Sequence, residues 1–109
     1  MERRLQDRKE IDLLGLVIDD TQKTEDSVEI LNINEGGMLF VGKRKKKTGS
    51  LVTITFSLPG ISATFKTTAL VVHCTPEWPL FRTGIQFKSL GLAERKLIRT
   101  FTNNEHQNR

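Results

Sequence analysis

The stretch LVTITFSLPGISATFKTTALVVHC, residues 51–74, decides the fold that we predict for this chain. In its first part, apolar residues at every second position alternate with threonine and serine, the period expected of a strand with one buried face. Pro59 and Gly60 then supply a turn, and the β-branched and apolar residues after them predict a second long strand. We therefore expect residues 51–58 and 61–74 to form an antiparallel hairpin.

Four more segments have the composition of strands. FRTGIQFK alternates like the first strand of the hairpin, and three apolar segments precede the hairpin in the sequence. A polar stretch at 19–26 and a segment with two prolines at 75–80 are expected to be loops. The further strands are expected at 11–18, 28–33, 38–41 and 81–88. Six strands at such short spacing favour a mainly β fold, a six-stranded antiparallel barrel.

The period of the apolar residues changes near the end of the chain. After Gly91 they recur every three or four residues, which is typical of a short amphipathic helix packed on a sheet. We expect this C-terminal α-helix at 91–102 and a frayed polar tail at 103–109. A barrel at 11–90 and a mobile, arginine-bearing segment at 1–10 complete a single domain over residues 1–109.

Length and composition agree with one small domain. The chain has 109 residues, of which 37% are hydrophobic and 28% charged, enough for one aliphatic core and against wholesale disorder. No apolar run approaches the roughly 18 residues needed to cross a bilayer, and no apolar signal segment follows the charged start. The expectation is a cytoplasmic protein without membrane insertion.

Positive charge gathers in two places, and the formal net charge of +4 favours anionic partners. Arg3, Arg4 and Arg8 with Lys9 form the first cluster, and the run Lys43–Lys47 forms the second. The run lies between two strands, so we expect a solvated hairpin tip that could touch a partner protein or membrane headgroups. A basic nucleic-acid-binding barrel is the less favoured alternative, because no aromatic residues interleave with the lysines.

Residues suited to metal binding or catalysis are sparse. Cys74 is the single cysteine, so an internal disulfide and a cysteine-built zinc site are excluded, and we expect its thiol to be a buried, inert strand residue. His73 and His106 are far apart in the sequence and have no carboxylate pattern of a metal site around them. The sequence contains no nucleophile elbow, Walker loop or evident carboxylate pair. We expect neither an enzyme nor a cofactor.

Two short motifs carry the functional prediction. RRLQDR, residues 3–8, offers guanidinium groups, whose forked donors match phosphate oxygens and the Hoogsteen edge of guanine. NINEGG, residues 32–37, offers amide side chains and bare backbone that can come close to a base or a phosphate. Each motif alone has an ordinary interpretation, solvated arginines and hairpin chemistry. Together they indicate a phosphate-rich, guanine-bearing ligand.

The order of these features resembles a known family. RRLQDR, an apolar strand, NINEGG leading into MLF, the FRTGIQF strand and a terminal helix look like the PilZ domain, a six-stranded barrel that binds the bacterial second messenger cyclic di-GMP. The resemblance extends from about Glu2 to Phe101 and so covers nearly the whole chain.

The resemblance implies a set of ligand-binding residues. The family's arginine motif, Arg-x-x-x-Arg, matches Arg4 and Arg8, and Arg3 is a common addition to it. The second motif is Asp or Asn, any residue, Ser, any two residues, Gly; its ends match Asn32 and Gly37. The full set implied for cyclic di-GMP is Arg3, Arg4, Arg8, Asn32, Asn34, Gly36 and Gly37.

The resemblance also implies a mechanism, in which the arginines close over the ligand. Asn32 would address a guanine edge, Asn34 would donate to a phosphate or a base, and the glycines would let the backbone turn or approach. Ordering of the N-terminal segment would change the surface that an unidentified downstream protein reads. Because Asn34 stands where the family prefers serine, the alternative is a degenerate PilZ-like adaptor that binds no nucleotide.

Overall fold

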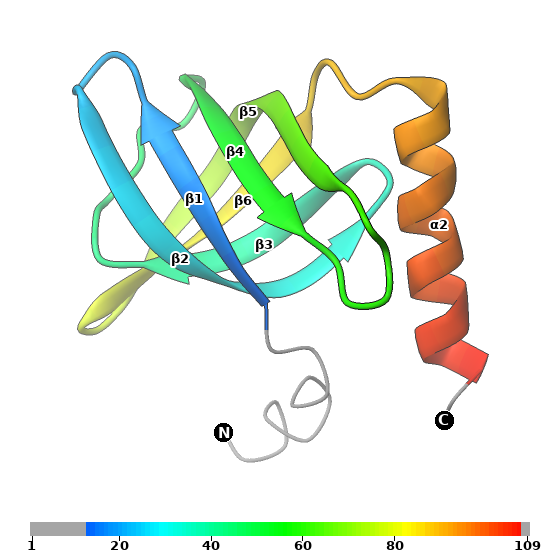
Figure 1. Ribbon diagram of the computed structural model, residues 1–109. Helices are drawn as coiled ribbons and strands as arrows, with labels where there is room; N and C mark the ends of the chain where they lie inside the picture. Colours follow the sequence, from blue (N-terminus) through cyan, green and yellow to red (C-terminus); the bar gives the residue numbers. More distant parts are fainter. Residues whose placement is uncertain (1–12, 108–109) are drawn as a thin grey trace.

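Antiparallel strands followed by a helix make up the part of the chain that the structure describes (Figure 1). The computed structural model describes residues 13–107, and for residues 104–107 it describes the backbone only. The elements are β1 (Leu13–Asp19), β2 (Thr24–Asn34), β3 (Gly37–Gly42), β4 (Leu51–Ser57), β5 (Thr64–Glu77), β6 (Leu80–Phe87) and α2 (Leu92–Gln107).

The strands form a closed antiparallel barrel in the order β1-β2-β3-β6-β5-β4, which confirms the predicted fold class. The predicted hairpin of β4 and β5 is also confirmed, with pairing from Ser57 and Thr64 to Leu51 and Leu70. β5 begins at Thr64 rather than at the predicted Ile61. The backbone N–H groups of Ile61 and Ala63 donate to carbonyls of the connecting loop instead of to a neighbouring strand.

Aromatic and aliphatic side chains fill the barrel, and α2 lies against one of its ends (Figure 1). The rings of Phe56 and Phe65 stack with centroids 5.0 Å apart, and those of Phe56 and Phe87 stack at 6.0 Å. Ile98 and Phe101 on one face of α2 are buried in the same core cluster. Burial of this face holds the helix on the barrel.

The helix begins and ends differently from the prediction. The carboxylate of Glu94 accepts a hydrogen bond of 2.7 Å from the backbone N–H of Gly91, which caps the first turn. The predicted helix stopped at residue 102, but α2 continues to Gln107 through the segment predicted to fray. The prediction was wrong there because polar residues alone do not end a helix, and neither glycine nor proline occurs after Gly91.

The predicted loops at 19–26 and 75–80 are shorter than expected, because strands extend into both of them. β1 continues to Asp19 and β2 begins at Thr24, so the connection between them is a tight turn. β5 likewise continues to Glu77, and Pro76 pairs with Phe81. A proline is tolerated there because β4 no longer pairs with this part of β5, so no ladder hydrogen bond is lost.

The lysine run was predicted to be a solvated hairpin tip; four of its five residues are exposed, but the hairpin was wrong, and so was the solvation of Lys46. β3 and β4 lie on opposite sides of the barrel, so the loop between them crosses from one side to the other. Lys46 is buried in this loop, and its Nζ lies 2.5 Å from Oδ2 of Asp26. Nε of Arg44 lies 2.7 Å from Oδ1 of the same carboxylate. A buried carboxylate on β2, which the sequence placed in a loop, thus anchors the loop to the barrel.

No helix among the described residues combines the length and the apolar character that crossing a membrane requires.

Candidate functional site

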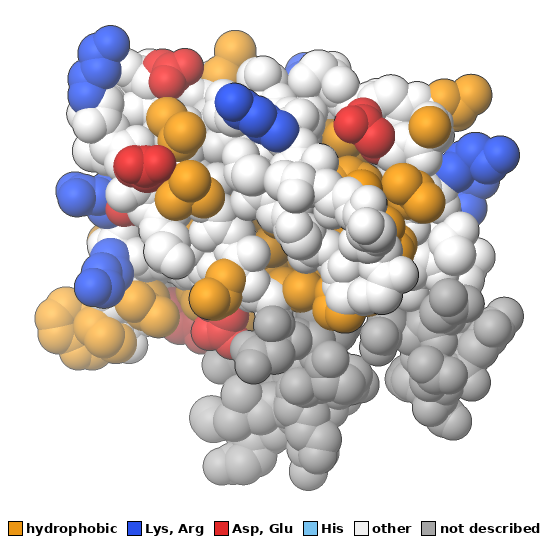
Figure 2. Space-filling view, in the orientation of Figure 1, with side chains coloured by type: hydrophobic (Ala, Val, Ile, Leu, Met, Phe, Trp, Pro, Cys, Tyr) orange, Lys and Arg blue, Asp and Glu red, His pale blue; other side chains and the backbone are white. Residues whose placement is uncertain are grey.

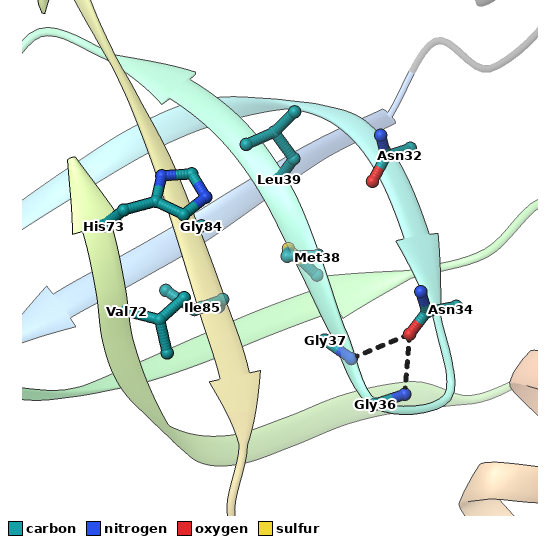
Figure 3. A pocket seen from close by; sticks show the side chains of 10 residues that line it. All are labelled: Asn32, Asn34, Gly36, Gly37, Met38, Leu39, Val72, His73, Gly84 and Ile85. Carbon is teal, nitrogen blue, oxygen red and sulfur yellow. Dashed lines mark hydrogen bonds between the residues drawn. The ribbon is translucent and has the colours of Figure 1, made fainter. Parts of the chain in front are cut away.

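The turn between β2 and β3 is shaped by the side chain of Asn34. Its Oδ1 accepts hydrogen bonds from the backbone N–H of Gly36 at 2.8 Å and of Gly37 at 3.1 Å (Figure 3). This is the geometry of an Asx turn, in which a short side chain replaces a backbone acceptor. Because both donors are N–H groups, the oxygen of the amide must face the turn, and the Nδ2 group is directed away from it.

Two further contacts hold this turn in place. The carbonyl of Gly36 accepts a hydrogen bond of 2.9 Å from the backbone N–H of Phe87 on β6. The carboxylate of Glu35 accepts hydrogen bonds from Arg99 on α2, at 2.8 Å from Nη2 and 3.2 Å from Nε. The hydrogen bond from Arg99 lowers the pKa of Glu35 below its usual value, so the carboxylate is favoured in its charged form. The turn is therefore fixed before any ligand arrives.

The two glycines of the turn differ in how closely the barrel packs against them. Neither Gly36 nor Gly37 has a positive φ. A Cβ on Gly37 would lie 2.1 Å from the carbonyl oxygen of Ile85, so its bare backbone allows β3 to approach β6 rather than a ligand. A Cβ on Gly36 would meet only Oδ1 of Asn34, at 3.4 Å, an ordinary contact.

A β-bulge in β2 turns both asparagines outward. Residues 28 and 30 point into the core, so uninterrupted alternation would point Asn32 and Asn34 inward as well. The pairing with β3 shifts between Ile30 and Asn32, and Leu31 takes the extra position and is buried. The shift reverses the alternation, so Asn32 and Asn34 are exposed on the outside of the barrel.

A second β-bulge, in β5, turns His73 to the outside of the barrel. Residues 65 to 71 alternate with odd positions inward, which would bury His73. The pairing with β6 shifts between Val71 and His73, and both Val72 and His73 are exposed. His73 pairs directly with Gly84, where a Cβ would lie 2.3 Å from Nε2 of the imidazole. The imidazole thus lies against the backbone of residue 84, and only glycine at this position leaves room for it.

These outward residues border one shallow hollow on the outside of the barrel (Figure 3). The hollow has a volume of about 380 Å³. Asn32 and Asn34 border it on β2, the imidazole of His73 borders it on β5, and β3 and β6 lie between them. The complete lining is Asn32, Asn34, Gly36, Gly37, Met38, Leu39, Val72, His73, Gly84 and Ile85. Amide donors, an aromatic ring and backbone suit a flat polar ligand such as a base.

The predicted arginines at positions 3, 4 and 8 lie outside the described residues. The described chain begins at Leu13, which pairs with Ile30 on β2, next to the bulge that precedes Asn32. At roughly 3.4 Å per residue, the covalent link from Leu13 gives Arg8 a reach of about 17 Å. Leu13 therefore lies in the part of the barrel that carries the bulge before Asn32, and the arginine motif precedes it in the sequence.

The sequence prediction brought together four residues that the structure also brings together, and it missed one. Asn32, Asn34, Gly36 and Gly37 all line the hollow, whereas His73 was interpreted as structural or exposed. Its signal in the sequence is the run VVHC, where two adjacent valines break the alternation of β5. Such a break is the mark of a bulge, but it does not reveal which side chains meet across the sheet.

The other candidate residues do not form a second polar centre. Cys74, predicted to be buried, is half-buried, and its Sγ accepts hydrogen bonds from the backbone N–H of Lys46 at 3.3 Å and from Thr83 Oγ1 at 3.4 Å. Among residues 13–103, whose side chains the structure describes, no group of three histidine, cysteine or acidic side chains is placed to hold a metal ion.

The described chain is thus a small closed barrel with a fixed turn and an open hollow on its outer wall. The model of one family, the PilZ domain, matches residues 2–104. The chain belongs to the PilZ domain family. The expected resemblance is thereby confirmed. No curated protein matches the chain.

Two solved structures share the fold at low sequence identity. The inhibitor of motility MotI/DgrA of Bacillus subtilis superposes with a TM-score of 0.77 at 14% identity, over 90% of this chain and 48% of that one. The PilZ domain of YcgR from Escherichia coli, solved with c-di-GMP, superposes with a TM-score of 0.67 at 13% identity, over 91% of this chain and 90% of that one. The chain thus spans about half the length of the Bacillus protein.

Proposed function

We propose that this domain is a cytoplasmic receptor for cyclic di-GMP and signals to a downstream protein. PilZ domains are receptor and adaptor domains, and the similar PilZ domain of YcgR was solved with this nucleotide. The observation that carries the proposal is the convergence of two bulges. They direct Asn32 and Asn34 from one side, and His73 from the other, onto a single hollow beside the start of β1.

Each group has a part in this proposal. The imidazole of His73 stacks on a guanine, and Asn32 addresses the edge of a base. Asn34 donates from Nδ2 to a phosphate or base while its Oδ1 continues to accept the hydrogen bonds of the turn. Arg3, Arg4 and Arg8 close over the nucleotide with charged hydrogen bonds to its phosphates.

Because the hollow is preformed, the proposed switch lies in the N-terminal segment. Ordering that segment over the ligand replaces a polar hollow by a surface of different shape and charge, which a partner protein can read. Amide hydrogen exchange across residues 2–10, with and without saturating cyclic di-GMP, tests this step. Protection on binding is expected, and equal exchange in both states would contradict the switch.

Isothermal titration calorimetry with cyclic di-GMP, cyclic di-AMP and GTP tests the ligand. We expect saturable binding of cyclic di-GMP, with weaker or absent binding of the other two. His73→Ala removes a stacking surface and should lower the affinity by roughly 5- to 100-fold. Thr75→Ala is the matched control, because Thr75 is exposed on the same strand but does not line the hollow.

The same titration separates the proposal from its alternative. If the folded protein binds none of the three nucleotides, the domain is an adaptor of PilZ fold without nucleotide binding. The observation in favour of that alternative is the use of the Asn34 oxygen within the turn. Asn34→Ser, which restores the preferred residue of the family, would then be the variant in which binding returns.

A further inference from the structure

The hairpin of β5 and β6 extends beyond the barrel. β4 pairs with β5 only as far as Leu70, and β3 pairs with β6 only from Phe81 onward, whereas β5 and β6 pair with each other up to Glu77 and Leu80. The connection at the tip is the dipeptide of Trp78 and Pro79. Figure 1 shows this hairpin projecting at the lower left, away from α2.

The tip presents an exposed indole. Trp78 is 91% exposed, the highest value among the large hydrophobic side chains of the described residues. Pro76 and Pro79 beside it are also exposed, and Leu80 is half-buried. Hydrophobic side chains gather at this place in the space-filling view (Figure 2). The projecting end is therefore apolar, whereas its flanks are not.

Free cations flank the apolar tip. Gly42 pairs with Phe81, so Lys43 leaves β3 next to the base of the tip, and the loop then returns along β5, where the backbone of Lys46 contacts Cys74. Lys43, Lys45 and Lys47 are exposed in this loop. Figure 2 shows Lys and Arg side chains on the surface next to the hydrophobic cluster.

Two carboxylates of this region are held in ion pairs. Asp26 lies between Arg44 and Lys46, and Glu77 is ion-paired with Arg82, whose Nε lies 2.7 Å from Oε1. These pairs engage two cations of the loop and one of the hairpin, so Lys43, Lys45 and Lys47 remain as the exposed lysines of the loop.

We propose that the Trp78 tip and the exposed lysines of the β3–β4 loop dock on the surface of a membrane that contains anionic phospholipids. An indole is favoured at the level of the headgroups, where its ring is apolar and its N–H remains hydrated. Lysines near such a surface are attracted by its negative potential. Lys43 follows the base of the tip and the loop continues from there along β5, so the tip and the loop lie on one side of the barrel and can face one docking surface. The proposal is independent of the nucleotide site.

A membrane suits this shape better than a nucleic acid or a folded protein does. Stacking on a single strand uses several aromatic side chains in succession, and among the phenylalanine and tryptophan residues of the described part only Trp78 is exposed. A stable protein interface buries about 800 Å² on each partner, far more than a two-residue tip presents. A lipid surface yields around a convex apolar tip.

Fluorescence tests the proposal directly, because Trp78 is the single tryptophan of the chain. With vesicles of equal parts phosphatidylcholine and phosphatidylglycerol, its emission should shift to shorter wavelength, and lipids brominated near the headgroup should quench it. With vesicles of phosphatidylcholine alone, neither change is expected. Trp78→Ala, followed by vesicle sedimentation, should lower binding at least tenfold, whereas Leu92→Ala, an exposed apolar residue on α2, should not.

Charge is tested by a matched pair of variants. The triple change Lys43→Gln, Lys45→Gln and Lys47→Gln should weaken partition by about 100-fold, since each lysine near an anionic surface contributes roughly fivefold. The triple change Lys66→Gln, Lys88→Gln and Lys96→Gln removes the same charge from exposed positions elsewhere and should have a much smaller effect. Thermal unfolding verifies that all variants are folded.

Three results would overturn the proposal. The first is an emission spectrum that anionic vesicles leave unchanged. The second is sedimentation with vesicles that shows no quenching of Trp78 and disappears only when Arg4 and Arg8 are replaced, since the contact would then lie at the N-terminal segment. The third is a shift produced by a single-stranded oligonucleotide but not by vesicles, which would assign the surface to nucleic acid.

Discussion

Glu35 in the turn between β2 and β3 and Arg99 on α2 are 64 residues apart in sequence and joined by two hydrogen bonds, of 2.8 and 3.2 Å. Arg95, one turn earlier on the helix, donates to the backbone carbonyl of Glu35 at 3.5 Å. The same turn carries Asn34, Gly36 and Gly37 of the proposed nucleotide site. The C-terminal helix therefore supports the geometry of the hollow, although it does not line it.

This contact predicts a pH dependence of stability. The hydrogen bond from Arg99 lowers the pKa of Glu35 below 4.5, so the folded state holds this proton less tightly than the unfolded state. The contribution to the free energy of unfolding is complete above about pH 4.5 and is lost as the pH falls through the lower pKa of the folded state. Urea unfolding should show Arg99→Gln less stable than the wild type at pH 7, with the difference shrinking toward pH 3. Lys96→Gln serves as the control, and a difference independent of pH would contradict the prediction.

The buried ion pair of Asp26 and Lys46 predicts an asymmetry between two substitutions. Asp26→Ala leaves the buried ammonium of Lys46 without its carboxylate, and this should lower the free energy of unfolding by about 3–5 kcal/mol. Lys46→Met leaves Asp26 paired with Arg44 and replaces the buried stem by an apolar one, so a loss of about 1 kcal/mol or less is expected. Chemical denaturation measures both, and equal losses would show that the pair does not act as described.

The two glycines of the turn should respond differently to alanine. Gly37→Ala places a methyl group 2.1 Å from a backbone oxygen of β6, which cannot move without breaking the barrel, so we expect a loss of about 3 kcal/mol or failure to fold. Gly36→Ala meets only a side-chain oxygen at 3.4 Å and should cost less than about 1 kcal/mol. Thermal unfolding of the two variants measures this difference, and equal stability of both would refute the close approach of β3 to β6.

For the nucleotide, Arg8→Ala should lower the affinity for cyclic di-GMP by roughly tenfold or more, because a charged hydrogen bond contributes about 1.5–3 kcal/mol. Lys9→Ala removes the same charge one position later in the sequence, outside the arginine motif, and should change the affinity less. Calorimetry compares the two. An unchanged affinity of Arg8→Ala would remove Arg8 from the site.

Much of the barrel could be predicted because alternation is local. Residues 51–57 follow a period of two that the pleat imposes on any strand with one buried face, and the structure agrees with it at every position from Val52 to Ser57. The helix after Gly91 was recognised for a similar reason. Its end was not, because a polar sequence is compatible with both helix and tail.

Errors occurred where distant contacts decide the structure. The sequence of Lys43–Lys47 looks like a solvated loop, and only the crossing of the barrel brings Lys46 to the carboxylate of Asp26. Likewise, Thr75 to Glu77 form a strand despite Pro76, since β6 supplies the pairing partner. A local sequence pattern shows neither which distant residue a side chain or strand will pair with nor whether that pairing will bury it.

The sequence by itself determined the strands, the terminal helix, the asparagine and glycine turn and the family to which the chain belongs. Tertiary structure alone decided which side chains share the hollow. The bulges at Leu31 and Val72 reverse the direction of every residue after them, and barrel closure then places Asn32 and His73 around the same hollow. Side-chain direction follows from strand register, and register depends on neighbours that are remote in the chain.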